Sequence, residues 1–312
     1  MRSPRQRPLA AHHVTSQPLA RVVVGIDFSE VSLATAQWVG RHLARDATLT
    51  LVHVIADPLL PNVLRLQAGG SGASDGPFQA RMQSLRGALR GLAAVVGGAE
   101  TRVEVRVGDP ALQLAAYADI VGADLVVVGG SSAFHAAPRG DTATTDRLLR
   151  HLARPGLVVR NVSARPGTVV AAIADNTEES VLALAQSVAS PCSARVGTIR
   201  VPSETRTPFL ETGRHPHADD PVASERAQRV IDAAGALRAD IIVIARDEPA
   251  PGVDDDVARL VARTATCSVL IVPQSAAPGF SCVPSRPWPG GFRRTPTTRR
   301  DATRSSPAHR ET

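Results

Sequence analysis

Two adjacent glycines end an apolar run in the segment "VVVGGSSAFHAAPRGDTATTDRLL", residues 126–149. A loop of small residues follows them, and then a stretch typical of a helix start. Such loops bind phosphate because glycine lets backbone amides approach closely and because the first amides of a helix attract anions. The candidate chemistry is therefore phosphate binding at Gly129, Gly130 and the loop after them.

The composition limits what this site can do. The chain has 312 residues, and all 35 of its Lys and Arg residues are arginine. The absence of lysine excludes a P-loop lysine, a Schiff base and a lysine general base. Ser131 and Ser132 lack the G-x-S-x-G elbow of a nucleophilic serine, and Asp27 and Asp124 fall at opposite ends of their strands. We expect no catalytic residues and no enzymatic activity.

The elements that position this loop alternate between strand and helix over residues 20–162, a predicted first domain. Apolar runs rich in β-branched residues predict buried strands at 21–27, 48–55, 124–129 and 156–160, and the alternating run 102–107 predicts one more. Segments of helical spacing separate them. The pattern indicates an α/β fold with a Rossmann-like, doubly wound parallel sheet. Ligands of such sheets bind beyond the carboxyl ends of the strands, where Asp27 and the 129–142 loop fall.

Residues 166–274 repeat this scheme as a predicted second domain. "RVVVGIDFSEVSLA" (21–34) is echoed by "TVVAAIADNTEES" (168–180), which pairs Asp27 with Asp175. Two more echoes relate "ADLVVVGG" (123–130) to "ADIIVIAR" (239–246) and "DRLLRHLARPGLVVR" (146–160) to "RLVARTATCSVLIVP" (259–273). Residues 78–107 have no clear counterpart. We therefore expect a shortened second copy that lacks one helix and an edge strand.

The two ends differ from this body in charge. The whole chain carries +6 and the two ends together hold +8, so residues 21–273 carry a net −2. Segments 1–19 and 275–312 are rich in arginine and poor in apolar residues, and we predict both to be disordered. The body has no basic stripe with aromatic residues, so we expect no specific nucleic-acid binding. No apolar run approaches the ~18 residues of a membrane span, so we expect no membrane partner.

Four segments in this order resemble the universal stress protein family in its tandem two-domain form. They are "VVVGIDFSEVS", "LVHVI", "VGDPALQLAAYADIVGADLVVVG" and "RLLRHLARPGLVVR". The resemblance implies a role in the stress response. It also implies an intramolecular pseudo-dimer, in which the last strands of the two domains, 156–160 and 268–272, lie together. Many members of the family bind ATP, and others bind no nucleotide.

The resemblance also implies where a nucleotide would bind. In ATP-binding members an aspartate ends the first strand, a backbone group of the second strand reaches the base, and the motif G-x2-G-x9-G-Ser/Thr holds the phosphates. Asp27, Val54 and Gly129 match these positions, with Gly130 beside them. The other motif positions hold Ser132, Thr142 and Ala143.

These departures from the motif affect the positions that would bind the phosphates. Ser132 and Thr142 carry Cβ atoms where the motif has glycine, and Asp141 adds a carboxylate at the helix start. We therefore expect no cofactor. The alternative is weak binding of ATP or another adenine nucleotide in the first domain, with Arg139, Ser131 and Thr144 as replacement donors. In the second copy Ala245 and Arg246 replace the two glycines, and three aspartates, 254–256, precede the helix.

The remaining candidate residues favour structural roles. His53 lies in a predicted strand, where we interpret it as a core histidine, and "HPHADD" (215–220) as a polar loop, so we expect no metal site. The three cysteines show no CxxC spacing, which favours a reducing, cytoplasmic location.

Three functions remain open from the sequence. The first is a regulatory universal stress-type protein that binds a partner protein and does not bind ATP strongly. The second is an ATP-binding member with weak ATPase activity in the first domain. The third is a scaffold whose Arg-rich C-terminal tail recruits an acidic partner or nucleic acid.

Overall fold

The computed structural model describes residues 18–56, 75–98, 100–130, 144–162, 165–174, 177–201, 221–246 and 256–273. All of them belong to the first of two compact units, Met1–Cys282, and the second unit, Val283–Thr312, lies outside the described residues. The predicted disordered segments, 1–19 and 275–312, also lie outside them apart from Pro18 and Leu19. Leu19 is buried in the core.

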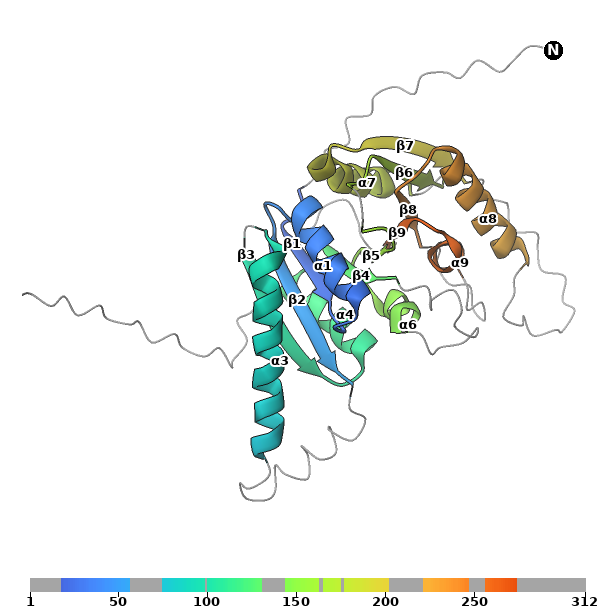
Figure 1. Cartoon of the computed structure of the whole chain (residues 1–312). Coiled ribbons are helices and arrows are strands. Elements are labelled where there is room, and N and C mark those ends of the chain that lie inside the picture. Colours follow the sequence, from blue (N-terminus) through green and yellow to red (C-terminus); the bar gives the residue numbers. More distant parts are fainter. Residues whose placement is uncertain are drawn as a thin grey trace, which may run out of the picture. The chain divides into compact units, whose positions relative to one another are not determined.

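Strands and helices alternate through the first half of the chain (Figure 1). The elements are β1 (Arg21–Gly25), α1 (Glu30–His42), β2 (Thr48–Ile55), α3 (Asp75–Val96), β3 (Glu100–Val107), α4 (Pro110–Val121), β4 (Leu125–Gly129), α6 (Thr144–His151) and β5 (Gly156–Val159). Each predicted strand of this half is present. The predicted α/β fold with a mostly parallel sheet is therefore confirmed.

The second half repeats the order with fewer described elements. They are β6 (Thr168–Ile173), α7 (Glu178–Cys192), β7 (Arg195–Arg200), α8 (Pro221–Ala236), β8 (Ile241–Ala245), α9 (Val257–Thr264) and β9 (Ser268–Val272). Residues 202–220, where the sequence predicts a loop, lie outside the described residues.

The described strands form one nine-stranded sheet in the order β3-β2-β1-β4-β5-β9-β8-β6-β7. Neighbouring strands are parallel within each half. The two halves meet where β5 pairs antiparallel with β9, with Leu157 opposite Leu270. The strand order reverses at β1/β4 and again at β6/β8, so each half has a switch point at the carboxyl ends of its strands.

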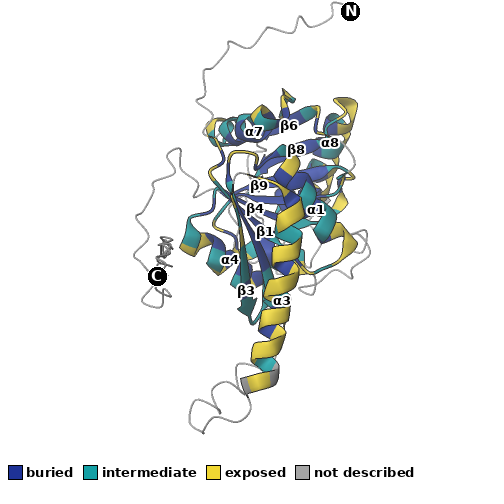
Figure 2. Cartoon of the chain, turned by 60° about the vertical axis from the view of Figure 1, so that its left-hand side comes forward, coloured by how far each residue is buried: buried dark blue, intermediate teal, exposed yellow. Residues whose placement is uncertain are grey.

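Two apolar clusters cover the two faces of this sheet. Buried residues of α1, α3 and α7 pack on one face, and those of α4, α6, α8 and α9 pack on the other. Figure 2 shows the contrast between the dark, buried strands and α3, where exposed residues dominate. Met82, Leu89 and Val96 are the buried residues of α3 among those whose burial is described, and their spacing of seven places them on one face of the helix. No helix among the described residues combines the length and apolarity needed to cross a membrane.

The same kind of contact fixes the start of the first strand in each half. The carboxylate of Asp124, before β4, accepts hydrogen bonds from the backbone amides of Ala20 and Arg21, each 2.8 Å long. Asp240, before β8, accepts the same bonds from Gly167 and Thr168, at 2.7 and 2.9 Å. Asp124 therefore has a structural role at the amino end of the sheet, away from Asp27.

Candidate nucleotide crevice

The carboxyl ends of β1, β2 and β4 meet at one edge of the sheet, because β1 lies between two parallel neighbours. Asp27 follows β1, Val54 lies near the end of β2, and Gly129 and Gly130 close β4. The structure thus brings these four predicted site residues to the same end of the sheet. The other two, Ser132 and Thr142, lie outside the described residues, as do Asp141 and Ala143.

Asp27 forms the turn that starts α1. Its Oδ1 accepts hydrogen bonds from the backbone amide of Ser29 at 2.9 Å and from the Ser29 hydroxyl at 2.6 Å. Ser29 is the N-cap of α1 and accepts from the amide of Ser32. Partial burial alone would raise the pKa of the Asp27 carboxyl, but the hydrogen bonds from Ser29 and Ser32 outweigh it and lower that pKa. Asp27 is therefore an ionised carboxylate whose Oδ1 is occupied by the turn.

Phe28 lies beside Asp27 in a strained backbone conformation. Its φ is 64°, in the left-handed region that a bulky side chain rarely adopts. Its ring packs on His53 of β2, with 4.8 Å between ring centroids. Nδ1 of His53 lies 2.7 Å from the carbonyl oxygen of Ile26, and since a carbonyl only accepts, Nδ1 carries the proton. His53 thus joins the ends of β1 and β2, which agrees with the structural role expected for it.

Gly129 and Gly130 are closely packed. A Cβ on Gly129 would lie 2.9 Å from Cγ1 of Val31 and 3.1 Å from Oγ1 of Thr35, both on α1. A Cβ on Gly130 would lie 2.8 Å from Cγ1 of Val158. The described glycines with positive φ are elsewhere, at Gly97, Gly98, Gly108 and Gly122.

The amide of Gly130 also has a partner within the protein. It donates to the carbonyl oxygen of Val159 at 2.7 Å. The sheet therefore occupies this donor, so the Gly130 amide is not available to bind a phosphate. Close packing of α1 and β5 against the end of β4 is a sufficient physical reason for both glycines.

We expect Gly129→Ala to lower the free energy of unfolding by about 1–2 kcal/mol, because its Cβ overlaps Val31 and Thr35. Urea denaturation measures this loss, and the loss should be the same with and without Mg-ATP. Gly235→Ala is the matched control, since a Cβ there meets nothing within 4 Å. A variant of unchanged stability whose ligand binding is impaired would contradict the packing role.

Comparison with known proteins identifies the first half. Residues 19–160 match the model of the universal stress protein family. This part of the chain is a universal stress protein domain. No curated protein matches the chain.

Solved universal stress proteins share the fold over both halves. One from Archaeoglobus fulgidus DSM 4304 is 13% identical with a TM-score of 0.56, and the match covers 81% of this chain and 96% of that chain. A putative universal stress protein from Pseudomonas aeruginosa UCBPP-PA14 is 15% identical with a TM-score of 0.51, covering 82% and 93%. Each match covers more of the chain than residues 19–160, so the likeness of fold extends past the universal stress protein domain.

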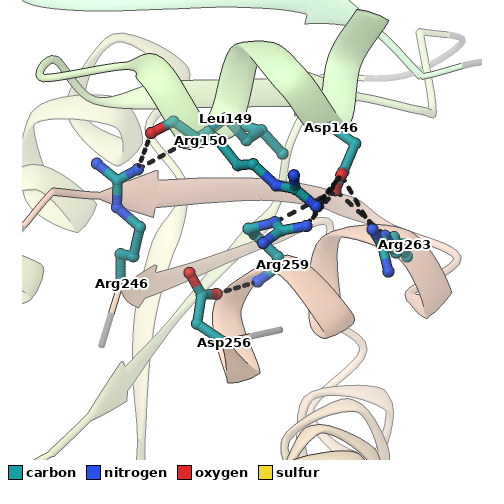
Figure 3. A network of polar contacts seen from close by, with 7 residues as sticks. All are labelled: Asp146, Leu149, Arg150, Arg246, Asp256, Arg259 and Arg263. Carbon is teal, nitrogen blue, oxygen red and sulfur yellow. Dashed lines mark hydrogen bonds and ion pairs between the residues drawn. The ribbon is translucent and has the colours of Figure 1, made fainter. Parts of the chain in front are cut away.

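The crevice of the second half differs from that of the universal stress protein domain at the glycine positions. Arg246, which aligns with Gly130, donates from Nη1 to the carbonyl oxygens of Leu149 and Arg150 at 2.7 and 3.0 Å. Its Nη2 donates to the carbonyl oxygen of Leu152 at 2.6 Å. This guanidinium therefore satisfies the last carbonyls of α6 and ties the second half to the first (Figure 3). No signal in the local sequence predicted this role.

Asp256 has a capping role in the same half. Its Oδ1 accepts from the amide of Arg259 at 2.6 Å and so caps α9. Asp175, Asp254 and Asp255 lie outside the described residues. Within the described part of the chain no group of His, Cys, Asp or Glu could hold a metal ion. The "HPHADD" segment falls outside that part.

Proposed function

We propose that the chain is a two-domain universal stress-type protein that acts in the stress response through binding and regulation, without catalysis and without strong ATP binding. The observation that supports this proposal is that the two glycines at the end of β4 are packed and hydrogen-bonded within the protein. The space beside Gly129 is filled by α1, and the Gly130 amide is bonded to Val159. In the sequence the following loop lacks the second and third glycines of the family's phosphate motif.

The proposal includes an intramolecular pseudo-dimer of the two halves. It is supported by the antiparallel pairing of β5 with β9 and by the bonds from Arg246 to α6. The proposal also includes binding of a separate partner protein, which is independent of these contacts between the halves.

We propose a cytoplasmic location. It is supported by the described cysteines, Cys192 and Cys267, which are both free thiols. Burial raises the pKa of the Cys192 thiol to about 11, so this thiol is neutral and poorly reactive near neutral pH.

Calorimetry with Mg-ATP and with adenosine tests the binding part of the proposal. We expect Mg-ATP to bind at roughly millimolar affinity, because a loss of a few kcal/mol at the phosphate seat lowers a micromolar site about a thousandfold. Adenosine has no phosphates and should be penalised less. Micromolar binding of Mg-ATP, tighter than adenosine, would contradict the proposal.

One observation favours the second candidate, a universal stress protein with a weak ATP site and slow ATPase activity. Oγ1 of Thr35 is buried, and it has no hydrogen-bond partner among the described residues, although such groups nearly always have one. It lies beside Gly129 at the carboxyl end of β4. Mass spectrometry of the small molecules that co-purify with the chain separates the two candidates, since retained adenine nucleotide supports the second.

A further inference from the structure

A buried charge cluster joins α6 of the first half to α9 of the second (Figure 3). The Asp146 carboxylate accepts from Arg259, with Nη2 to Oδ2 at 2.9 Å and Nε to Oδ1 at 3.3 Å. Arg263 adds contacts of 3.0 and 3.2 Å, and Arg150 lies 3.5 Å away on the next turn of α6. The side chains of Asp146 and Arg259 are only 2% and 4% exposed. One buried carboxylate therefore faces three guanidinium groups.

Asp146 is ionised in this setting. Its burial alone would raise the pKa, but the hydrogen bonds and charge of Arg259, and then those of Arg263, outweigh burial and lower the pKa of the carboxyl. A buried carboxylate of this kind is stable only while its cationic partners remain in place.

Asp146 and Arg259 occupy equivalent positions in the two halves. The repeat that aligns 146–160 with 259–273 pairs them at a separation of 113 residues, and the same alignment pairs Arg150 with Arg263. It also pairs Leu157 with Leu270, and these two residues face each other in the β5–β9 register. A local two-fold axis therefore passes between β5 and β9. At such an axis each position meets its own equivalent.

The charges break this two-fold symmetry. If the first half paired with a second copy of itself, Asp146 would meet Asp146, with Arg150 of each copy in the place that Arg263 takes here. If the second half did so, Arg259 and Arg263 would meet their own copies without Asp146. Like charges in direct buried contact are strongly unfavourable, and only the mixed pairing places opposite charges together at the 146/259 position itself.

We propose that the Asp146–Arg259 position makes the junction selective: it accepts the first half paired with the second and rejects either half paired with its own copy. The partner that fits the β5 and α6 surface is thus the β9 and α9 surface with its two arginines. The selectivity rests on the proposed pairing of the halves and is independent of nucleotide binding. It works by repulsion in the wrong complexes as well as attraction in the right one.

Charge reversal in the full chain tests this selectivity. Asp146→Arg makes the first half resemble the second, and Arg259→Asp makes the second resemble the first. We expect each to lower the Tm by about 10 °C or more, because breaking a buried pair leaves uncompensated like charges. The double variant exchanges two residues related by the two-fold axis. It places Asp at 259 beside Arg at 146, Arg150 and Arg263, so we expect it to recover at least half of the loss.

Matched controls separate selectivity from a general loss of packing. The pair Asp119–Arg154, at 3.1 Å, is partly exposed, and its reversals and swap should change the Tm by only about 1–2 °C. If single reversals fail to fold, the neutral changes Asp146→Asn and Arg259→Gln and their double variant measure the same coupling.

The outcomes distinguish the two proposals. A swap variant that loses as much as the two single reversals combined would overturn the selectivity while leaving the pairing of the halves intact. Single reversals without effect on the Tm would overturn the pairing itself, because Asp146 and Arg259 would then not be in contact. A folded swap variant beside unfolded single reversals would support the selectivity.

Discussion

Mg-ATP is expected to bind about a thousandfold more tightly to the variant Ser132→Gly/Asp141→Ser/Thr142→Gly/Ala143→Ser than to the unmodified chain. Three of the changes restore the residues of the family's phosphate motif, at positions 132, 142 and 143, and the fourth replaces Asp141 beside them. Two remove Cβ atoms where amides must approach phosphate, and one removes a carboxylate that repels it. A thousandfold change corresponds to about 4 kcal/mol.

Adenosine is the control for this variant. It lacks phosphates, so the four changes should leave its affinity nearly unaltered in the same calorimetric measurement. An equal gain for adenosine would mean that the changes act on the nucleoside side of the crevice, near Asp27 and Val54. No gain for Mg-ATP would mean that the loop is not the missing part of a phosphate seat.

Gly40→Ala is expected to cost about 3 kcal/mol in the free energy of unfolding. A Cβ at this position of α1 would lie 2.3 Å from the carbonyl oxygen of Val96 and 2.7 Å from its Cγ1. The nearest atom is backbone at the end of α3, so the two helices must separate to make room. This overpacking outweighs the ~1 kcal/mol that alanine normally gains over glycine inside a helix.

Gly87→Ala is the control, for which we expect a change in stability of the opposite sign. Gly87 lies within α3, and a Cβ there meets nothing within 4 Å. We expect this variant to be more stable than the unmodified chain by up to about 1 kcal/mol. Urea denaturation of both variants decides the matter, and equal stabilities would show that α1 and α3 are not in close contact at Gly40.

The sequence predicts the sheet well because the signals for its strands are local. The runs at 21–27 and 48–55 depend on neighbouring residues alone, and both strands appear where predicted, as β1 and β2. The role of Gly129 is not predictable in this way. A glycine that allows a phosphate to approach and a glycine that allows a helix to pack closely look the same in the sequence. The atoms that show which role Gly129 has belong to Val31 and Thr35, far earlier in the chain.

The junction was harder still to predict. Arg246 reaches carbonyls 94 to 97 residues before it, and Asp146 meets a residue 113 positions later. An arginine in place of a glycine, and an aspartate aligned with an arginine, give no local sign of their partners. The positive φ of Phe28 likewise depends on its packing against His53 and on the turn at Asp27.

The pairing of β5 with β9 also protects the chain from aggregation. Every residue of Gly156–Val159 and of Ser268–Val272 is buried, and eight of the nine are apolar or glycine. Parted, each strand would present unpaired amides and carbonyls along an apolar ribbon, which is a template for further strands of any chain. Among the described strands the free flanks belong instead to β3, with Arg102 and Arg106, and to β7, with Arg195 and Arg200 at its ends. Charged residues on edge strands of this kind disfavour the addition of a further strand. The β5–β9 pairing therefore keeps the most apolar strands in the interior of the sheet and leaves charged strands at its edges.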